Sequence, residues 1–282
     1  MRERAPAYAL QARERLPGAE AAFGAWDRER RAAGILIAGG VAFRFFLWLV
    51  PLGLALAALV SFWGEYDSEG LEDAANEFGI GVTAMETAED ALETSDGNRI
   101  ALLLVAVGLT AWFSLGAVRA LLIAFALAWN LERPRLRKPV RAVGIFNGVY
   151  LLGTLSPLGL AWLREQEGLG GLVGLLLTFA LTLALALLVM WLLPRRAERW
   201  QELLPGAALV AVGFQLLHAA VVFYFAPKLE RSSELYGSLG VAAAILLWLY
   251  FSARLLTAGA FLNAALWERR LARAAAAQAS SE

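Results

Sequence analysis

The chain has 282 residues, of which 59% are hydrophobic and only 18% charged, and its mean hydropathy is +0.58. Soluble domains average about 45–50% apolar and about 25% charged residues, so this composition excludes a soluble or disordered chain and predicts an integral membrane protein. Its 25 basic and 25 acidic residues cancel, so the net charge indicates no partner. The absence of cysteine excludes disulfides, thiol catalysis and sulfur-based metal sites, and the single histidine argues against a histidine metal centre.

Residues 1–32 carry both signs of charge and do not resemble the short basic start of a signal peptide. Within them, Phe23 and Trp26 lie close to several arginines, a pattern typical of a helix on the membrane surface. A solvated lead-in helix explains the same residues equally well. On either explanation, we interpret residues 1–32 as a cytoplasmic amphipathic segment that precedes the membrane domain.

Six apolar segments follow, and each reaches the roughly 20 residues that a helix needs to cross a hydrocarbon core of about 30 Å. None shows the alternation of a barrel strand, and a backbone in lipid must satisfy its hydrogen bonds within the segment. The predicted fold class is therefore all-α: a polytopic bundle of six transmembrane helices in residues 33–267. The six predicted spans are, approximately, 33–63, 100–129, 140–163, 169–193, 205–226 and 237–267.

The basic residues lie almost entirely on one side of these spans. The N-terminal segment, the loops 130–141 and 194–204, and the tail 268–282 together hold 18 Lys and Arg residues, against three in the loops on the other side. Because basic loops stay in the cytoplasm, we expect both termini to be cytoplasmic.

The loop 64–98 holds eleven acidic residues and no basic one. Its apolar residues recur at helical spacing on both sides of a break at Gly79 and Gly81, which predicts two short amphipathic helices that form a small extracytoplasmic cap. A solvated face explains the acidic residues, and anion repulsion or Ca²⁺ binding remain alternatives, although no EF-hand spacing is present.

Three arginines, Arg44, Arg119 and Arg254, and the single His218 lie well inside spans. Counted from the cytoplasmic ends, all four lie about 15–20 Å deep at 1.5 Å per residue. A central arginine costs about 2.5–3.5 kcal/mol on insertion scales, and no Asp or Glu lies in the middle of a span. We expect these residues to line a midplane cavity that binds an anionic substrate. Separate contacts to backbone carbonyls, or snorkelling to the interface, are the alternative.

Other residues in the spans fit the same cavity. Asn147 and Tyr150 in the third span and Gln215 in the fifth are candidate lining residues, although polar side chains also join helices to one another. Pro51 and Pro157 remove backbone hydrogen bonds within spans, which predicts either hinges or fixed kinks. Glycine-rich stretches such as 170–174 suit helix packing first and homo-oligomer contacts second.

Several stretches resemble one known family when they are taken together. These are the aromatic run from Gly40 to Pro51, Ala128-Trp-Asn130, and, in the last span, Tyr236-Gly-Ser-Leu-Gly240, Leu247-Trp-Leu-Tyr250 and Gly259-Ala-Phe-Leu-Asn263. They are similar to the YihY/virulence factor BrkB family of bacterial inner-membrane proteins, over residues 20–268. The resemblance implies a six-span protein of the bacterial cytoplasmic membrane. It implies no settled activity, since the family has been called a ribonuclease, a virulence factor and a lipid transporter.

Two positions depart from that family's pattern. Trp48 stands where a serine is usual, and Arg44 stands where a tyrosine is common. Any role of those polar positions in the family does not carry over to this chain.

Motifs of catalysis are missing from the sequence. There is no HExxH, no G-x-S-x-G turn, no nucleotide-binding loop and no carboxylate cluster in the short basic loops. We therefore expect neither an enzyme nor a metal or cofactor, and we expect membrane lipids rather than nucleic acid as partners. The leading hypothesis is a transporter or flippase for an anionic lipid, lipid-linked headgroup or anionic solute. A non-transporting scaffold or lipid-binding partner of envelope enzymes is the alternative, followed by an anion pore or a ribonuclease.

Overall fold

The computed structural model describes residues 19–60, 99–132, 134–136, 138–164, 169–220 and 226–281. Every regular element in these ranges is a helix, which confirms the all-α prediction. The predicted acidic cap at 64–98 lies outside the described residues. The helices are α2 (Ala19–Arg31), α3 (Gly34–Val60), α6 (Arg99–Ala128), α7 (Pro139–Arg164), α8 (Leu169–Leu192), a 3₁₀ helix (Trp200–Leu203), α9 (Leu204–Ala220) and α10 (Ala226–Ala279).

Five of the described helices are long and apolar enough to cross a membrane: α3, α6, α8, α10, and α9 together with the 3₁₀ helix before it. This confirms a polytopic helical membrane protein. The third predicted span, α7, has 26 residues, which exceeds the roughly 20 that a crossing needs. The count of six spans stays a prediction.

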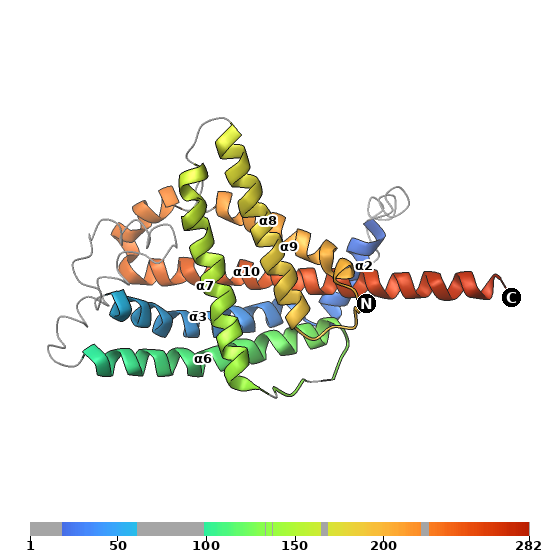
Figure 1. The fold of residues 1–282 in the computed structure, drawn as a ribbon, viewed down its shortest axis with the longest axis horizontal. Coiled ribbons are helices and arrows are strands. Elements are labelled where there is room, and N and C mark those ends of the chain that lie inside the picture. The colour runs from blue at the N-terminus through green and yellow to red at the C-terminus, as the bar shows by residue number, and fades with distance from the viewer. Residues whose placement is uncertain are drawn as a thin grey trace.

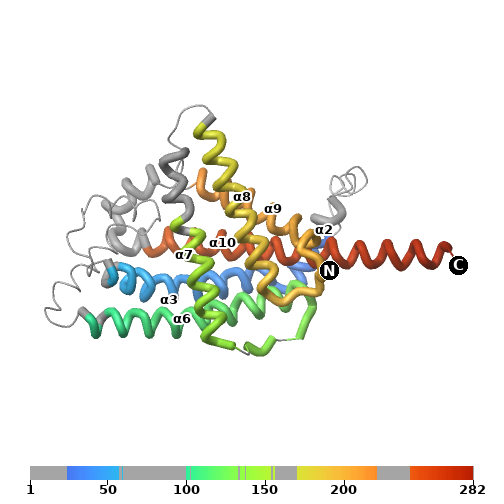
Figure 2. Tube along the Cα trace, in the orientation of Figure 1, coloured from blue at the N-terminus to red at the C-terminus, as the bar shows by residue number. Residues whose placement is uncertain are grey.

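Helices α3, α6 and α10 run nearly parallel along the long axis of the molecule, and the hairpin of α7 and α8 crosses them steeply (Figure 1). The basic α6–α7 and α8–α9 connections lie at the same end as α2 (Figure 1). Figure 2 shows that α10 continues past the bundle as a separate arm. It extends beyond the predicted sixth span because residues 268–279 are rich in alanine and other strong helix formers.

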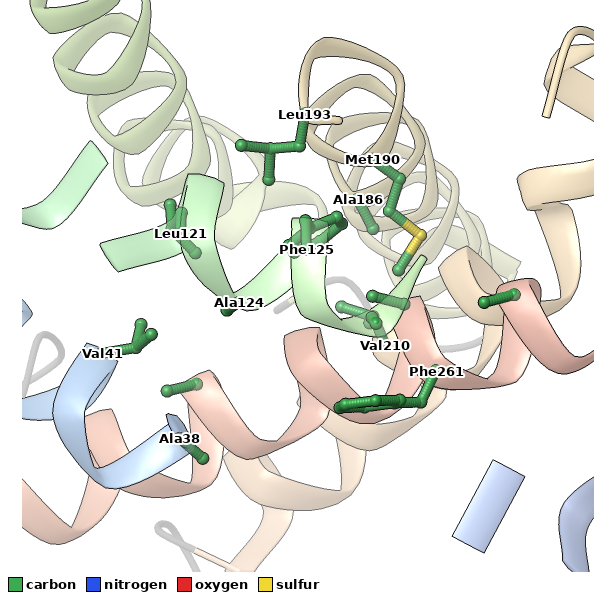
Figure 3. Close-up of a cluster of buried hydrophobic side chains, with 14 of the residues drawn as sticks. Ala38, Val41, Leu121, Ala124, Phe125, Ala186, Met190, Leu193, Val210 and Phe261 are labelled. Atoms are coloured by element: carbon green, nitrogen blue, oxygen red, sulfur yellow. The ribbon is translucent and has the colours of Figure 1, made fainter. Parts of the chain in front are cut away.

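The core lies where α3, α6, α8, α9 and α10 meet (Figure 3). Small residues contribute much of it, including Ala38 on α3 and Ala124 on α6, and they let the helices approach closely. Phe125, Met190 and Phe261 fill the remaining space and are at most 1% exposed. Many leucines and valines face outward instead, as expected for side chains in contact with lipid.

The end of α6 explains the Ala128-Trp-Asn130 motif. Asn130 has a left-handed φ of 52°. It is the capping residue of a Schellman motif, in which Leu131 N donates to Ala126 O and Asn130 N donates to Leu127 O. The Asn130 carbonyl also accepts a hydrogen bond from Arg196 Nη2 at 2.9 Å, which links the two basic connections. Asparagine tolerates this left-handed conformation better than most residues, so the motif ends the helix.

Replacing Asn130 with alanine is expected to destabilise the protein by about 1 kcal/mol, because a Cβ-bearing residue without a local hydrogen-bonding group disfavours positive φ. Asn130→Gly is expected to retain the stability of the original chain. Thermal unfolding of both variants in detergent measures the difference. Equal melting of the alanine and glycine variants would contradict this role of Asn130.

Candidate functional site

Arg44 on α3 and Arg119 on α6 are both exposed on the surface of the bundle. The Arg44 guanidinium lies over Gly116 of α6. A Cβ added to Gly116 would lie 3.5 Å from Arg44 Nη1. Arg119 follows Gly116 by three residues, so it lies one turn further along the same side of α6. Among the described residues, neither arginine has an ion-pair partner. We call Arg44 and Arg119 the arginine pair.

A buried polar network lies one turn along α3 from Arg44. Trp48, 1% exposed, donates from Nε1 to Asn147 Oδ1 on α7 at 3.1 Å. Asn147 Nδ2 donates in turn to Ser114 Oγ on α6 at 2.8 Å, and Ser114 donates to the carbonyl of Thr110. This network joins three helices, α3, α6 and α7, at a single layer.

The predicted lining residues of the third span belong to this network. Asn147 Nδ2 donates to Ser114 Oγ and to the Val143 carbonyl, so this side chain joins α7 to α6, and its place in a cavity lining stays a prediction. Tyr150 is half-buried and packs edge-on against Trp48, with ring centroids 4.5 Å apart. Trp48, the residue that replaces the usual serine, is therefore the centre of the α3–α7 contact.

Arg254 on α10 forms an ion pair with Glu29 of α2. Glu29 is 6% exposed, and the side chain of Arg254 is 22% exposed. The sequence pattern does not reveal this pair, because Glu29 lies in the segment before the first span and not in a span. The pair also places the Arg254 guanidinium near the start of α3. Arg44 lies at a different level, ten residues or about 15 Å further into that helix. The prediction of one shared arginine layer is therefore wrong for Arg254.

The Glu29–Arg254 pair lies in a half-open groove of about 490 Å³ between α2 and the start of α3. We call it the α2–α3 groove. Its lining includes Trp26, Glu29, Arg30, Ile35, Leu36 and Arg254, but not Arg44, Arg119 or His218.

Local backbone features build this groove. Ala33, with a φ of 53°, turns the chain between α2 and α3. Gly34 leaves the space that Glu29 occupies, since a Cβ on Gly34 would come within 2.3 Å of Glu29 Cγ. A second ion pair, from Arg28 Nη1 to Glu268 Oε2 at 2.5 Å, holds α2 against α10.

The remaining predicted residues lie elsewhere in the bundle. His218 is exposed on α9, and Gln215, one turn before it, is half-buried. Pro51 is buried, and α3 continues through it to Val60, while α7 likewise continues through Pro157. Neither helix ends at its proline, so the hinges stay predictions. In the described ranges, no group of three or more His, Cys, Asp or Glu residues could hold a metal ion.

The motif from Gly259 to Asn263 forms a close crossing of α9 and α10, which the sequence did not predict. Asn263, 1% exposed, accepts from the Gly206 N–H at 2.7 Å and donates to the Leu203 carbonyl at 3.0 Å. Asn263 Oδ1 therefore satisfies a backbone N–H that the start of α9 would otherwise leave unpaired. A Cβ on Gly206 would meet the Gly259 carbonyl oxygen at 2.3 Å, so both glycines are needed for the approach.

The chain is similar to known membrane proteins along most of its length. A family model described as Virulence factor BrkB matches residues 25–282. A UPF0761 membrane protein of Nitrosospira multiformis is 26% identical over 257 residues, which cover 82% of this chain and 57% of the relative. A UPF0761 membrane protein of Tolumonas auensis is 33% identical over 107 residues, or 38% of this chain and 35% of the relative.

The chain thus spans little more than half the length of the first relative. No solved structure matches it. Because the family model covers nearly the whole chain, this protein belongs to the BrkB virulence factor family of membrane proteins.

Proposed function

We propose that this protein moves an anionic lipid headgroup between the two leaflets of the membrane, along the exposed arginine pair. The observation that carries the proposal is the position of Arg44 and Arg119 on adjacent helices within apolar spans, where neither has a carboxylate partner among the residues that the structure describes. An uncompensated guanidinium in hydrocarbon is costly, and a phosphate headgroup neutralises it with paired hydrogen bonds. Such a site therefore favours an anion wherever the membrane offers one.

The surroundings of the arginine pair favour a lipid over a soluble anion. Phe43, next to Arg44, is 53% exposed, and Ile123, one turn beyond Arg119, is 43% exposed. Apolar side chains on an outward-facing surface suit the acyl chains of a lipid, whose headgroup would contact the arginines. A soluble anion would need an enclosed polar path, and the polar side chains beside Arg44 are engaged with one another.

Movement of labelled lipid in vesicles tests this proposal. The purified protein is reconstituted in vesicles with a fluorescent phosphatidylglycerol, and a membrane-impermeant quencher reports how much label remains in the inner leaflet. The original chain is expected to equilibrate the label faster than protein-free vesicles. The Arg44→Gln/Arg119→Gln double variant is expected to lose about tenfold or more of this rate, since each lost charge contact is worth about 1.5–3 kcal/mol.

The matched control is Arg135→Gln/Arg141→Gln, which removes two exposed arginines. Arg135 lies in the α6–α7 connection, and Arg141 lies in the first turn of α7. This control is expected to move lipid at the original rate. Equal rates in the control and the Arg44/Arg119 variant, or no movement by the original chain, would contradict the proposal.

A non-transporting scaffold is the second candidate function, and the arm of α10 favours it. Residues 271–279 continue α10 beyond the bundle, and all of them are exposed, as on a helix that meets a partner (Figure 2). Binding of labelled lipid without movement between leaflets would select this function. Ion conductance that does not saturate would select the anion pore instead.

A further inference from the structure

The α2–α3 groove combines a charged floor with apolar walls. Its floor is the ion pair of Glu29 and Arg254, and the walls include Trp26, Ile35 and Leu36, which are 53%, 58% and 77% exposed. Its volume of about 490 Å³ falls in the range of small-molecule sites. An amphipathic ligand with a charged head and an apolar body fits this division.

The position of the groove along the first span indicates where such a ligand would come from. The groove lies where the first span begins, at the end of the molecule that carries the basic connections (Figure 1). Trp26 is the kind of side chain that sits at the headgroup level of a bilayer. Ile35 and Leu36 belong to the first turn of the span, so they reach the depth at which acyl chains begin.

The Glu29–Arg254 pair has the chemistry of an exchangeable contact. The guanidinium of Arg254 is planar and matches a phosphate as well as it matches a carboxylate. Glu29 holds that guanidinium when no ligand is bound, so the arginine does not remain uncompensated at the membrane surface. Arg30 also lines the groove.

We propose that the α2–α3 groove binds the phosphate headgroup of a phospholipid from the leaflet on the basic side, with Arg254 exchanging Glu29 for the phosphate. The apolar walls contact the glycerol and upper acyl chain. This site is separate from the arginine pair, and its occupancy does not depend on movement of lipid between leaflets.

Native mass spectrometry of the detergent-purified chain tests the site by titration with dioleoylphosphatidylglycerol. Arg254→Gln is expected to weaken binding about tenfold, since it removes the principal charge contact. Glu29→Gln is expected to strengthen binding several-fold, because it removes the competing carboxylate while keeping a similar shape. A variant that merely damages the fold would weaken binding, so this gain distinguishes ligand exchange from a structural role.

Arg31→Gln is the matched control, since it removes an exposed arginine of α2 that lies outside the groove lining. It is expected to bind lipid as the original chain does. The Arg44→Gln/Arg119→Gln variant is also expected to keep this binding, which separates the groove from the translocation proposal. Opposite effects of Glu29→Gln and Arg254→Gln would support the exchange, and weakening by both would overturn it.

Two further probes identify the ligand. Dioleoylglycerol has the same acyl chains without the phosphate, and its binding is expected to be much weaker. Equal binding of dioleoylglycerol would overturn the role of the phosphate. Glycerol 3-phosphate carries the headgroup chemistry without acyl chains, and binding as tight as that of the lipid would overturn the lipid assignment in favour of a soluble phosphate compound.

Discussion

Gly206→Ala is expected to destabilise the protein by about 3 kcal/mol or more, at or above the upper end of overpacking costs. The added Cβ would lie 2.3 Å from the Gly259 carbonyl oxygen and 2.4 Å from Asn263 Nδ2. Neither neighbour yields easily, because one is helix backbone and the other is held by hydrogen bonds to Gly206 and Leu203. The whole α9–α10 crossing must therefore separate. Thermal unfolding in detergent, followed by intrinsic tryptophan fluorescence, measures the loss.

Gly39→Ala on α3 is the matched control, since no atom lies within 4 Å of its Cβ position. This variant is expected to melt at or slightly above the original temperature, because alanine favours a helix over glycine by up to about 1 kcal/mol. If Gly206→Ala melts with the control, the two helices do not cross as closely as described.

Asn147→Leu is expected to cost about 1–3 kcal/mol, because it leaves the buried Trp48 N–H without an acceptor. Leucine is similar in size to asparagine, so the loss reports the hydrogen bonds more than the packing. The same thermal unfolding measures it, and the hairpin of α7 and α8 is expected to become more susceptible to proteolysis, since this network joins α7 to both α3 and α6.

A double-mutant cycle with Trp48→Phe isolates the hydrogen bond. Removing both partners is expected to cost less than the two single changes added together, because no buried donor then lacks an acceptor. Additive losses would show that Trp48 and Asn147 are not coupled, and the network would then not hold the three helices together.

The same network bears on the proposed function. It places Trp48 one turn from Arg44 and joins that part of α3 to α6, which carries Arg119. A variant such as Asn147→Leu therefore loosens the frame of the arginine pair without removing either charge. Comparison of its lipid movement with that of Arg44→Gln/Arg119→Gln separates the effect of rigidity from the effect of charge.

The helices themselves were predictable from the sequence. Long runs of leucine, alanine and valine specify a membrane helix segment by segment, because each helix satisfies its backbone hydrogen bonds within itself. The start of α6 at Arg99 and that of α8 at Leu169 lie within a residue of their predicted positions. The end of α6 at Ala128 likewise lies within a residue of its predicted position.

The contacts between helices were decided only by the tertiary structure. Nothing local connects Glu29 with Arg254, Trp48 with Asn147, or Gly206 with Asn263, which are separated by 57 to 225 residues. Each contact depends on which faces of the helices meet, and small differences in packing select those faces from many that are equally apolar. The sequence by itself therefore determined an all-α membrane protein with arginines inside its spans. Tertiary packing decided that Arg254 has an acidic partner from α2, while Arg44 and Arg119 remain exposed on the bundle surface.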